Sequence, residues 1–254
     1  MEMKKVLVVG CNGRMGKLVC EAITKSDDFE VLAGYDVEDL GLHPFHIFTS
    51  SAELHSTKLD FDLIIDFSAP ESTMKVAHYA FFARTPIVIA TTGFTAEQEF
   101  SIEMWSEIIP VFKSANMSYG VNAVNQLLKL ATKLLGDDYE IAISEFHHSG
   151  KKDAPSGTAK MFFNTINEAR DNTLTSSYGS TGKKQQNEVW IASQRAGAFP
   201  GEHTVTFAGQ NDFIRIEHFA HTPAMFAEGA LQAARYLLEQ NKPGLYTMDD
   251  MFKQ

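Results

Sequence analysis

The sequence has few of the features that mark secreted, metal-binding or nucleic-acid-binding proteins. Only two cysteines, Cys11 and Cys20, occur among its 254 residues, which argues against a disulfide framework and favours a reducing compartment. No Cys/His spacing resembles a zinc site, so no metal is predicted. The formal net charge of −10 provides no basic surface for nucleic acid or for an anionic membrane, and neither partner is expected.

Long apolar runs are also missing. The apolar run at residues 6–9 is too short for a signal peptide, and no later segment is long enough to span a bilayer. We therefore expect a soluble, cytoplasmic protein. The hydrophobic fraction of 44% supports a sizeable core, and the chain length favours two domains slightly over one.

A strand, a glycine-rich loop and a helix are predicted near the start of the chain. The β-branched run at residues 6–9 leads into a loop with the spacing G-x-x-G-x-x-G. Gly10 permits a tight turn, Gly13 lets the backbone approach a pyrophosphate, and Gly16 lets the helix pack closely on the strand. The loop predicts a dinucleotide site, although a structural glycine turn explains this motif alone equally well.

A second strand, residues 29–35, ends at Asp36, twenty residues after Gly16. An acidic side chain there can accept hydrogen bonds from the adenosine ribose hydroxyls and repels a 2′-phosphate. Val37 follows, and no arginine stands beside it. This combination favours NADH over NADPH. The alternative, that Asp36 is simply a turn residue, has comparable weight.

Strands and helices continue to alternate as far as residue 113. Residues 38–58 have a weak pattern and are predicted as loop with a short helix. Beyond them, strands are predicted at 63–67, 86–90 and 110–113, and helices at 70–84 and 95–109. The alternation predicts an α/β fold, a Rossmann-type doubly wound parallel sheet, in which ligands bind beyond the carboxyl ends of the strands. The residues expected at those ends are Thr91, Thr92, Ser114, Ala115, Asn116 and Met117.

The pattern changes after Gly120. An apolar helix at 121–135 precedes three alternating runs at 188–194, 203–208 and 213–219, with a polar loop, expected to be mobile, at 175–187. The period of two and the short separations of the three runs predict an inserted α+β domain built on a mostly antiparallel sheet.

An alanine-rich helix from Pro223 to about residue 240 is expected to return to the first domain. The predicted dinucleotide-binding domain therefore comprises residues 1–118 plus 227–254. Residues 119–226 are predicted to form a substrate-binding and oligomerisation domain.

The densest cluster of reactive side chains is the stretch 145–159, E-F-H-H-S-G-K-K-D-A-P-S-G-T-A, between a predicted strand at 139–143 and a predicted helix at 159–170. Histidine passes protons near neutral pH, and lysine supplies positive charge or acts as an acid. The Ser-Gly-Thr helix entrance suits a carboxylate or phosphate. A polar surface loop with Thr158 as an ordinary N-cap is the simpler alternative, but the clustering of two imidazoles and two ammonium groups favours a site.

These motifs together resemble the dihydrodipicolinate reductases, the 4-hydroxy-tetrahydrodipicolinate reductases of bacterial lysine and diaminopimelate synthesis. The strongest match is E-x-H-H-x-x-K-x-D-A-P-S-G-T-A at 145–159. Supporting matches are G-x-x-G-R-M-G at 10–16, I-D-F-S at 65–68, T-T-G at 91–93 and G-E-H-T-V-T-F-A at 201–208. The resemblance covers nearly the whole chain.

The resemblance implies reduction of a cyclic dicarboxylate, 4-hydroxy-tetrahydrodipicolinate, with NADH or NADPH by a homotetramer assembled through the second domain's sheets. It implies that His147 is the acid/base and Lys151 the proton donor. The implied substrate-binding residues are His148, Ser156, Gly157 and Thr158. The implied cofactor-binding residues are Gly10, Cys11, Asn12, Gly13, Arg14, Met15, Asp36, Ala90, Thr91, Thr92, Ser114, Ala115, Asn116 and Met117.

The sequence departs from the family at three places. Ala90 stands where glycine is common, Met117 stands where an aromatic residue is common, and residues 222–226 carry no arginine. Two other functions stay open: a different nicotinamide-dependent amino-acid dehydrogenase, and a dinucleotide-sensing protein without turnover. A sensor has no use for His147 and Lys151 together, which favours the reductase.

Overall fold

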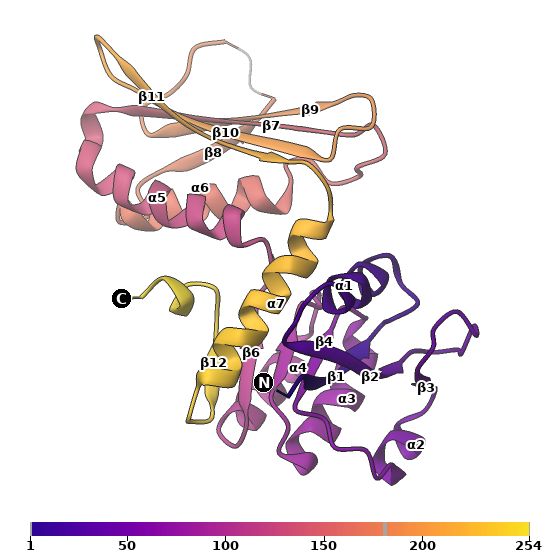
Figure 1. Ribbon diagram of the computed structural model, residues 1–254. Helices are drawn as coiled ribbons and strands as arrows, with labels where there is room; N and C mark the ends of the chain where they lie inside the picture. Colours follow the sequence, from indigo (N-terminus) through magenta and orange to yellow (C-terminus); the bar gives the residue numbers. More distant parts are fainter. Residues whose placement is uncertain (1, 180–181, 254) are drawn as a thin grey trace. The chain divides into compact units, whose positions relative to one another are not determined.

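The computed structural model describes residues 2–179 and 182–253, and the chain divides into two compact units (Figure 1). Unit 1 comprises the residues up to Tyr119 and from Pro223 onward, and unit 2 comprises Gly120–Thr222. Unit 2 is therefore inserted into unit 1. The chain passes between the units at residues 119 and 222, where the sequence places the boundaries at 118 and 226.

Unit 1 is built on a seven-stranded parallel sheet with the strand order β12-β6-β5-β4-β1-β2-β3. Its strands are β1 (Lys4–Val9), β2 (Phe29–Tyr35), β3 (His46–Phe48), β4 (Leu63–Asp66), β5 (Ile87–Ile89), β6 (Pro110–Lys113) and β12 (Gly244–Tyr246). Its helices are α1 (Arg14–Thr24), α2 (Ser51–Ser56), α3 (Pro70–Ala83), α4 (Ala96–Ser106) and α7 (Ala224–Glu239), with the short 3₁₀ turn η2 (Asp250–Phe252).

Helices cover both faces of this sheet, because its central strand is apolar on both sides. Val6 and Val8 of β1 pack with residues of α1 and α7, whereas Leu7 and Val9 pack with residues of α2, α3 and α4. A parallel sheet that is buried on both faces requires such continuous apolar strands. The predicted doubly wound α/β sheet is confirmed.

Local signals in the sequence of unit 1 correspond to observed caps and bounds. The capping box before α4 is formed: the Thr95 hydroxyl accepts from the Gln98 amide, and the Gln98 side chain accepts from the Thr95 amide. Helix α1 begins at Arg14, inside the G-x-x-G-x-x-G motif and before its third glycine. The edge strands β3 and β12 were not predicted, because three residues are too few to establish an alternating pattern.

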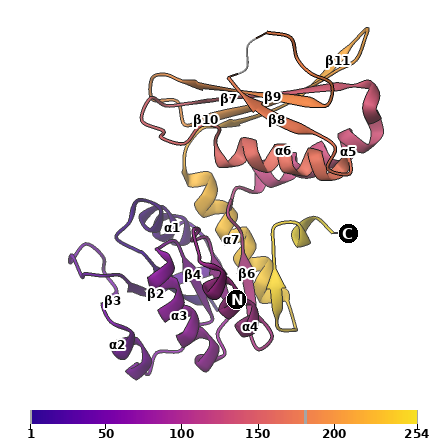
Figure 2. The same ribbon diagram turned by 180° about the vertical axis from the view of Figure 1, so that it is seen from behind.

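Unit 2 contains a five-stranded sheet with the order β11-β10-β7-β9-β8. Its strands are β7 (Glu140–His147), β8 (Thr175–Tyr178), β9 (Glu188–Arg195), β10 (Gly201–Ala208) and β11 (Phe213–Ala220). Its helices are α5 (Tyr119–Leu135) and α6 (Gly157–Ala169), with the 3₁₀ turn η1 (Gly136–Asp138). Figures 1 and 2, which show the ribbon from opposite sides, both place α5 and α6 on one face of the sheet.

The sheet of unit 2 is mixed, which corrects the prediction of a mostly antiparallel sheet. Strand β10 pairs antiparallel with β7 and β11, whereas β9 pairs parallel with β7 and β8. A period of two gives the buried face of a strand but not its direction. The connection from β7 to β8 runs through α6, the kind of crossover that joins parallel strands.

Two further expectations for unit 2 need correction. Strand β7 continues to His147, beyond the predicted end at residue 143, so this histidine lies on the strand and not in the loop after it. The region 175–187 begins with β8 and was predicted as a mobile loop throughout. Two positions of that loop, 180 and 181, lie outside the described residues.

Candidate active site

The glycine loop of unit 1 joins the end of β1 to the start of α1. Gly10 has φ 75°, and its amide donates a hydrogen bond of 2.8 Å to the carbonyl of Tyr35 at the end of β2. A Cβ atom added to Gly16 would lie 2.0 Å from the carbonyl oxygen of Gly10. Only glycine fits at these two positions, so the loop is tight and α1 lies close to β1.

The first turn of α1 leaves backbone donors for an anion. Gly13 is the N-cap, it makes no side-chain cap hydrogen bond, and the first turn carries no acidic residue. Gly13 and Arg14 are exposed, and Met15 is half-buried. Unpaired amides and the positive end of the helix dipole bind phosphate. This arrangement fits the pyrophosphate of a dinucleotide.

Asp36 is fixed beside the glycine loop. Its Oδ2 accepts a hydrogen bond of 2.8 Å from the Asn12 amide, and its Oδ1 accepts one of 2.8 Å from the Val37 amide. The Asn12 side-chain amide donates to the carbonyl of Glu38, while Asn12 Oδ1 is buried without a hydrogen-bond partner among the described residues. A carboxylate with two oxygens has further lone pairs, so Asp36 can still accept from ribose hydroxyls.

A buried carboxylate, Asp66, ties together the turns after β4 and β5. It accepts hydrogen bonds from the hydroxyls of Ser68 (2.5 Å), Thr73 (2.5 Å) and Thr91 (3.1 Å). Burial raises the pKa of Asp66, and the hydroxyl donors oppose that shift. Asp66 was assigned no role from the sequence, although the I-D-F-S match contains it. It holds Thr91 and the start of α3 in place at the carboxyl end of the sheet.

Two residues predicted to contact the cofactor have their side chains in the core of unit 1. Cys11 has no exposed surface, and burial raises the pKa of its thiol to about 12, so it is not a reactive thiolate. Met117 is 2% exposed and packs in the cluster that contains residues of α7. The other predicted residues that follow β5 and β6 differ in exposure. Thr91 is buried, Thr92 and Ala115 are exposed, and Ala90, Ser114 and Asn116 are half-buried.

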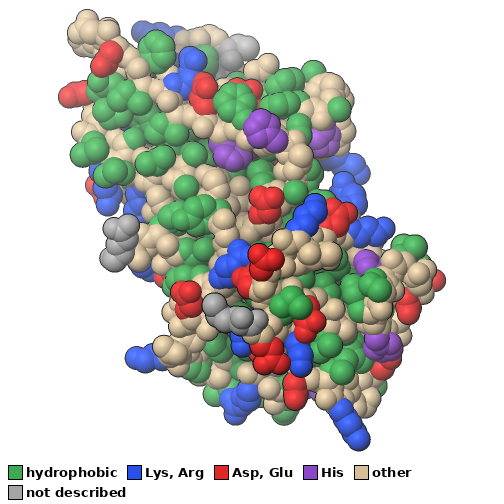
Figure 3. All heavy atoms as spheres, in the orientation of Figure 1, with side chains coloured by type: hydrophobic (Ala, Val, Ile, Leu, Met, Phe, Trp, Pro, Cys, Tyr) green, Lys and Arg blue, Asp and Glu red, His purple; other side chains and the backbone are tan. Residues whose placement is uncertain are grey.

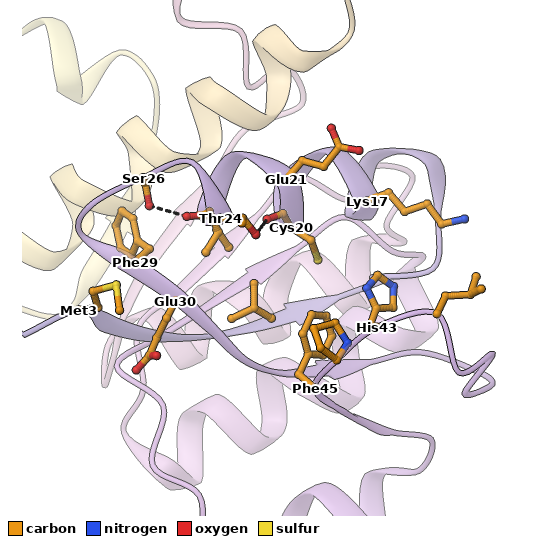
Figure 4. Close-up of a pocket in the computed structure, with 14 residues that line it drawn as sticks. Met3, Lys17, Cys20, Glu21, Thr24, Ser26, Phe29, Glu30, His43 and Phe45 are labelled. Carbon is orange, nitrogen blue, oxygen red and sulfur yellow. Dashed lines mark hydrogen bonds between the residues drawn. The ribbon is translucent and has the colours of Figure 1, made fainter.

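A separate cavity of about 510 Å³ lies beside α1 and β2 (Figure 4). It is lined by Lys17 and Cys20 from α1, by Val31 from β2, and by the stacked rings of His43 and Phe45. The connection between β2 and β3 contains no helix, and residues 42–45 of this connection line the cavity. None of the predicted site residues lines the cavity.

In unit 2, the end of β7 presents a buried carboxylate and a buried imidazole. Glu145 and His147 are 1% and 7% exposed, on the side of β7 that also buries Ile141 and Ile143. Oε2 of Glu145 lies 2.5 Å from Nδ1 of His147. Burial lowers the pKa of His147, and the Glu145 carboxylate opposes that effect without reversing it. The imidazole is therefore neutral at pH 7.

The start of α6 is connected to the same carboxylate. Ser156 is the N-cap, because its hydroxyl accepts from the Ala159 amide at 3.1 Å. Thr158 is the second residue of the helix, which corrects its assignment as the cap in the surface-loop alternative. The Ser156 amide donates to Glu145 Oε1 at 3.3 Å, and the Ser156 hydroxyl lies 2.8 Å from Nε2 of His203.

Lys151 belongs to this network through a neighbouring acid. Its Nζ lies 2.8 Å from Asp153 Oδ1, and the carbonyl of Asp153 accepts a 2.6 Å hydrogen bond from Arg195. His148 and Gly157 are exposed, and Thr158 is half-buried. The structure thus joins His147, Ser156 and Lys151 in one network, while His148 lies on the surface nearby in sequence.

Three residues of this network were not predicted from the sequence: Glu145, Arg195 and His203. Glu145 and His203 lie inside the matched motifs, so the motifs contained a signal for them. Arg195 lies at the end of an alternating run and had none. It becomes adjacent to the site because the parallel register of β9 places it opposite His147.

No helix among the described residues has the length and hydropathy needed to cross a bilayer. No three His, Cys, Asp or Glu side chains in the described part of the chain are grouped as a metal ion requires.

A doubly wound sheet with a glycine loop after its first strand and an inserted unit rich in imidazole and ammonium groups defines a nicotinamide-dependent oxidoreductase. Family models described as "Dihydrodipicolinate reductase, N-terminus" and "Dihydrodipicolinate reductase, C-terminus" match residues 4–117 and 120–252. The chain belongs to the dihydrodipicolinate reductase family. It reduces 4-hydroxy-tetrahydrodipicolinate with a nicotinamide cofactor, a step of lysine and diaminopimelate biosynthesis.

Relatives with this activity in their names match the chain over its length. The 4-hydroxy-tetrahydrodipicolinate reductase of Caldanaerobacter subterraneus subsp. tengcongensis is 42% identical over 255 residues, with 99% of each chain covered. That of Clostridium novyi is 39% identical over 254 residues, again with 99% of each covered. These matches confirm the predicted activity and decide against the amino-acid dehydrogenase and the sensor.

Solved structures share the fold at low sequence identity. Dipicolinate-bound dihydrodipicolinate reductase from Paenisporosarcina sp. TG-14 superimposes with a TM-score of 0.83 at 20% identity, covering 99% of this chain and 100% of the other. A probable dehydrogenase from Thermotoga maritima gives 0.65 at 10% identity, covering 97% and 92%. The fold is therefore shared with other dehydrogenases, and the sequence relatives identify the family.

Proposed function

We propose that unit 1 binds NADH in preference to NADPH, and that the end of β7 and the start of α6 in unit 2 bind the substrate and supply its protons. The observation that carries the cofactor preference is the position of Asp36, whose carboxylate is hydrogen-bonded to the Asn12 amide inside the glycine loop. Residues 37–39 are Val, Glu and Asp, so no cation follows it.

A 2′-phosphate beside Asp36 would meet a fixed negative charge. Two like charges about 4 Å apart repel by roughly 1 kcal/mol in water and roughly 4 kcal/mol at the effective dielectric constant of a protein surface. Since each 1.4 kcal/mol changes an equilibrium constant by about tenfold, a preference of tenfold or more follows. A ribose 2′-hydroxyl can instead donate to the carboxylate.

Substrate binding in unit 2 is supported by its local charges. The first turn of α6 contains no acidic residue, so the positive end of its dipole suits one substrate carboxylate. Lys151 precedes that helix start in the chain and is paired with Asp153, whose carboxylate also accepts from the Gly157 amide. The residues proposed to hold the carboxylates are His148, Ser156, Gly157 and Thr158.

The proton-transfer roles are divided between Lys151 and His147. When bound, the reduced nicotinamide supplies the hydride, so the substrate must also gain a proton and lose its hydroxyl as water. We assign Lys151 as the proton donor, because its Nζ carries N–H donors and is held 2.8 Å from Asp153 Oδ1. His147 donates its Nδ1–H to Glu145, which leaves Nε2 to accept and return a proton.

We also propose a homotetramer that assembles through the sheet of unit 2. Helices α5 and α6 cover one face of this sheet, and no helix of unit 2 covers the other in the described residues (Figure 2). Two large apolar side chains, Phe213 and Phe219, are exposed on β11, on the opposite face from the core residue Ile216, and Figure 3 shows hydrophobic side chains gathered on unit 2. Light scattering of the purified protein measures its mass directly, and a monomeric mass contradicts the proposal.

The experiment that tests the cofactor and site assignments is a steady-state assay with freshly made substrate and NADH or NADPH. A higher kcat/KM for NADH supports the role of Asp36, and an equal or reversed ratio contradicts it. His147→Ala and Lys151→Ala should each lower turnover by about 10²- to 10⁴-fold, the usual contribution of general acid–base catalysis. NADH affinity, measured by fluorescence, should stay unchanged, because these residues lie in unit 2.

A further inference from the structure

We infer that Arg195, at the end of β9, is a positioning residue for the reaction. Its guanidinium group holds both side chains proposed to move protons, His147 through Glu145 and Lys151 through Asp153. The inference rests on the proposed roles of His147 and Lys151.

The first contact is a two-point ion pair. Nη1 of Arg195 donates to Oε2 of Glu145 at 2.8 Å, and Nη2 donates to Oε1 at 2.8 Å. The Glu145 side chain has no exposed surface and that of Arg195 is 19% exposed. A planar guanidinium fixes the plane of the carboxylate as well as its position, which a lysine cannot do. Without this cation, Glu145 would be a buried, uncompensated charge.

The carboxylate transmits this orientation to the imidazole. Oε2 of Glu145 holds Nδ1 of His147 at 2.5 Å, which fixes the tautomer that has the proton on Nδ1. Nε2 then faces Gly201, where an added Cβ would approach it to 2.7 Å. The glycine therefore leaves the ring the space that its fixed orientation requires.

The second contact controls the loop that carries the lysine. Nη2 of Arg195 also donates to the backbone carbonyl of Asp153 at 2.6 Å. The Asp153 side chain holds Lys151 Nζ at 2.8 Å. One guanidinium thus connects the end of β7 with the loop before α6, and it sets the positions of the imidazole and the ammonium group together.

Charge and geometry can be separated at this site. The charged or titratable groups around His147 are Glu145 on its own strand, Lys151 in the following loop, Arg195 on β9 and His203 on β10. Arg195→Lys keeps the positive charge and removes the planar fork. A loss of activity in this variant therefore reports positioning, not the local field.

The experiment compares Arg195→Lys with Arg235→Lys, a matched control on α7 whose arginine forms an exposed two-point pair with Asp28. We expect Arg195→Lys to lower kcat by about 100-fold, within the range of general acid–base catalysis, and the control to retain its kcat within about twofold. NADH affinity, which reports on unit 1, should be the same in both. A kcat within about twofold of the unsubstituted enzyme in Arg195→Lys overturns the inference.

A second variant protects the test against simple misfolding. In Arg195→Ala, millimolar guanidinium chloride should raise kcat by about tenfold, because the free ion can form the same two-point contact. Sodium chloride of equal ionic strength should leave the kcat of this variant unchanged. No rescue, together with a loss of thermal stability, means that Arg195 acts through folding and overturns the inference.

The outcomes also separate this inference from the proposed function. If His147→Ala and Lys151→Ala retain full turnover, the assigned proton-transfer roles fail, and the inference fails with them. If both lose turnover while Arg195→Lys retains it, only the inference fails.

Discussion

The carboxylate of Glu145 lies 2.5 Å from the imidazole of His147, two residues further along β7, and both side chains are buried. Residues two apart on a strand point to the same face, so the contact is built into the strand itself. The positive charge that balances this carboxylate comes from Arg195, which forms a two-point ion pair with it, and not from the histidine. The pair is therefore a neutral imidazole hydrogen-bonded to an ionised carboxylate.

Glu145→Gln should move the pH profile of the enzyme. Burial lowers the pKa of His147, and Glu145 raises it in opposition, so removing the negative charge lowers the pKa further. The acidic limb of kcat/KM that reports His147 should shift to lower pH, and kcat should fall by about 10- to 100-fold, because glutamine presents a weaker acceptor. The control is Glu53→Gln, whose carboxylate lies 2.9 Å from the imidazole of His46 in an exposed pair. A limb that shifts to higher pH would show that the carboxylate does not act on His147.

His203 should make the stability of unit 2 depend on pH. Burial lowers the pKa of His203 to about 3, from 6.5 in an unfolded chain. As the pH falls, the unfolded chain therefore binds a proton at this histidine before the folded chain does. The contribution of neutral His203 to the free energy of unfolding is fully present above pH 6.5 and is lost as the pH falls toward 3. The free energy of unfolding should fall by about 1.4 kcal/mol per pH unit in that window. Denaturant unfolding at pH 7 and pH 5 measures this difference, and His203→Gln should reduce the slope, whereas the exposed His46→Gln should not.

Asp36→Ser should reverse or abolish the cofactor preference. The substitution removes the carboxylate that accepts from the Asn12 and Val37 amides, and with it the repulsion of a 2′-phosphate. The ratio of kcat/KM for NADH to that for NADPH should fall by about tenfold or more. Asp39→Asn, an exposed neighbour, serves as the control. An unchanged ratio would assign the preference to another group.

Gly16→Ala should destabilise unit 1 and weaken NADH binding. The new Cβ would lie 2.0 Å from the Gly10 carbonyl oxygen, so α1 must move away from the glycine loop. Overpacking of this kind costs about 1–3 kcal/mol. Thermal unfolding and fluorescence titration with NADH measure the two effects. Gly120→Ala is the comparison, because its Cβ would approach other atoms to 3.4 Å, an ordinary contact.

Features set by neighbouring residues were predictable from the sequence. Strand β2 has the predicted bounds, and the Thr95 capping box forms as its spacing indicates. The glycine loop depends on Gly10, Gly13 and Gly16, which lie close together in the sequence. Each of these signals is local, so no knowledge of distant contacts is needed to read it.

Features that depend on pairing between distant segments were not predictable. Glu145 and Arg195 are fifty residues apart, and only the parallel register of β7 and β9 brings them together. The same limit applies to the direction of β9, which its alternating pattern leaves open. Ser156 and Thr158 are both capping residues by type, and the geometry of the α6 start selects Ser156.

The return of the chain to unit 1 sets an order of events during synthesis. Helix α7 contributes Ala227, Ala230 and Ala234 to one core of unit 1, and β12 completes its sheet beside β6. Residues 1–119 alone therefore lack part of their core until residues from 223 onward have been made. Unit 2 has all its strands by residue 220. Domains usually fold in the order in which they leave the ribosome; here the unit that starts second is the first that can finish.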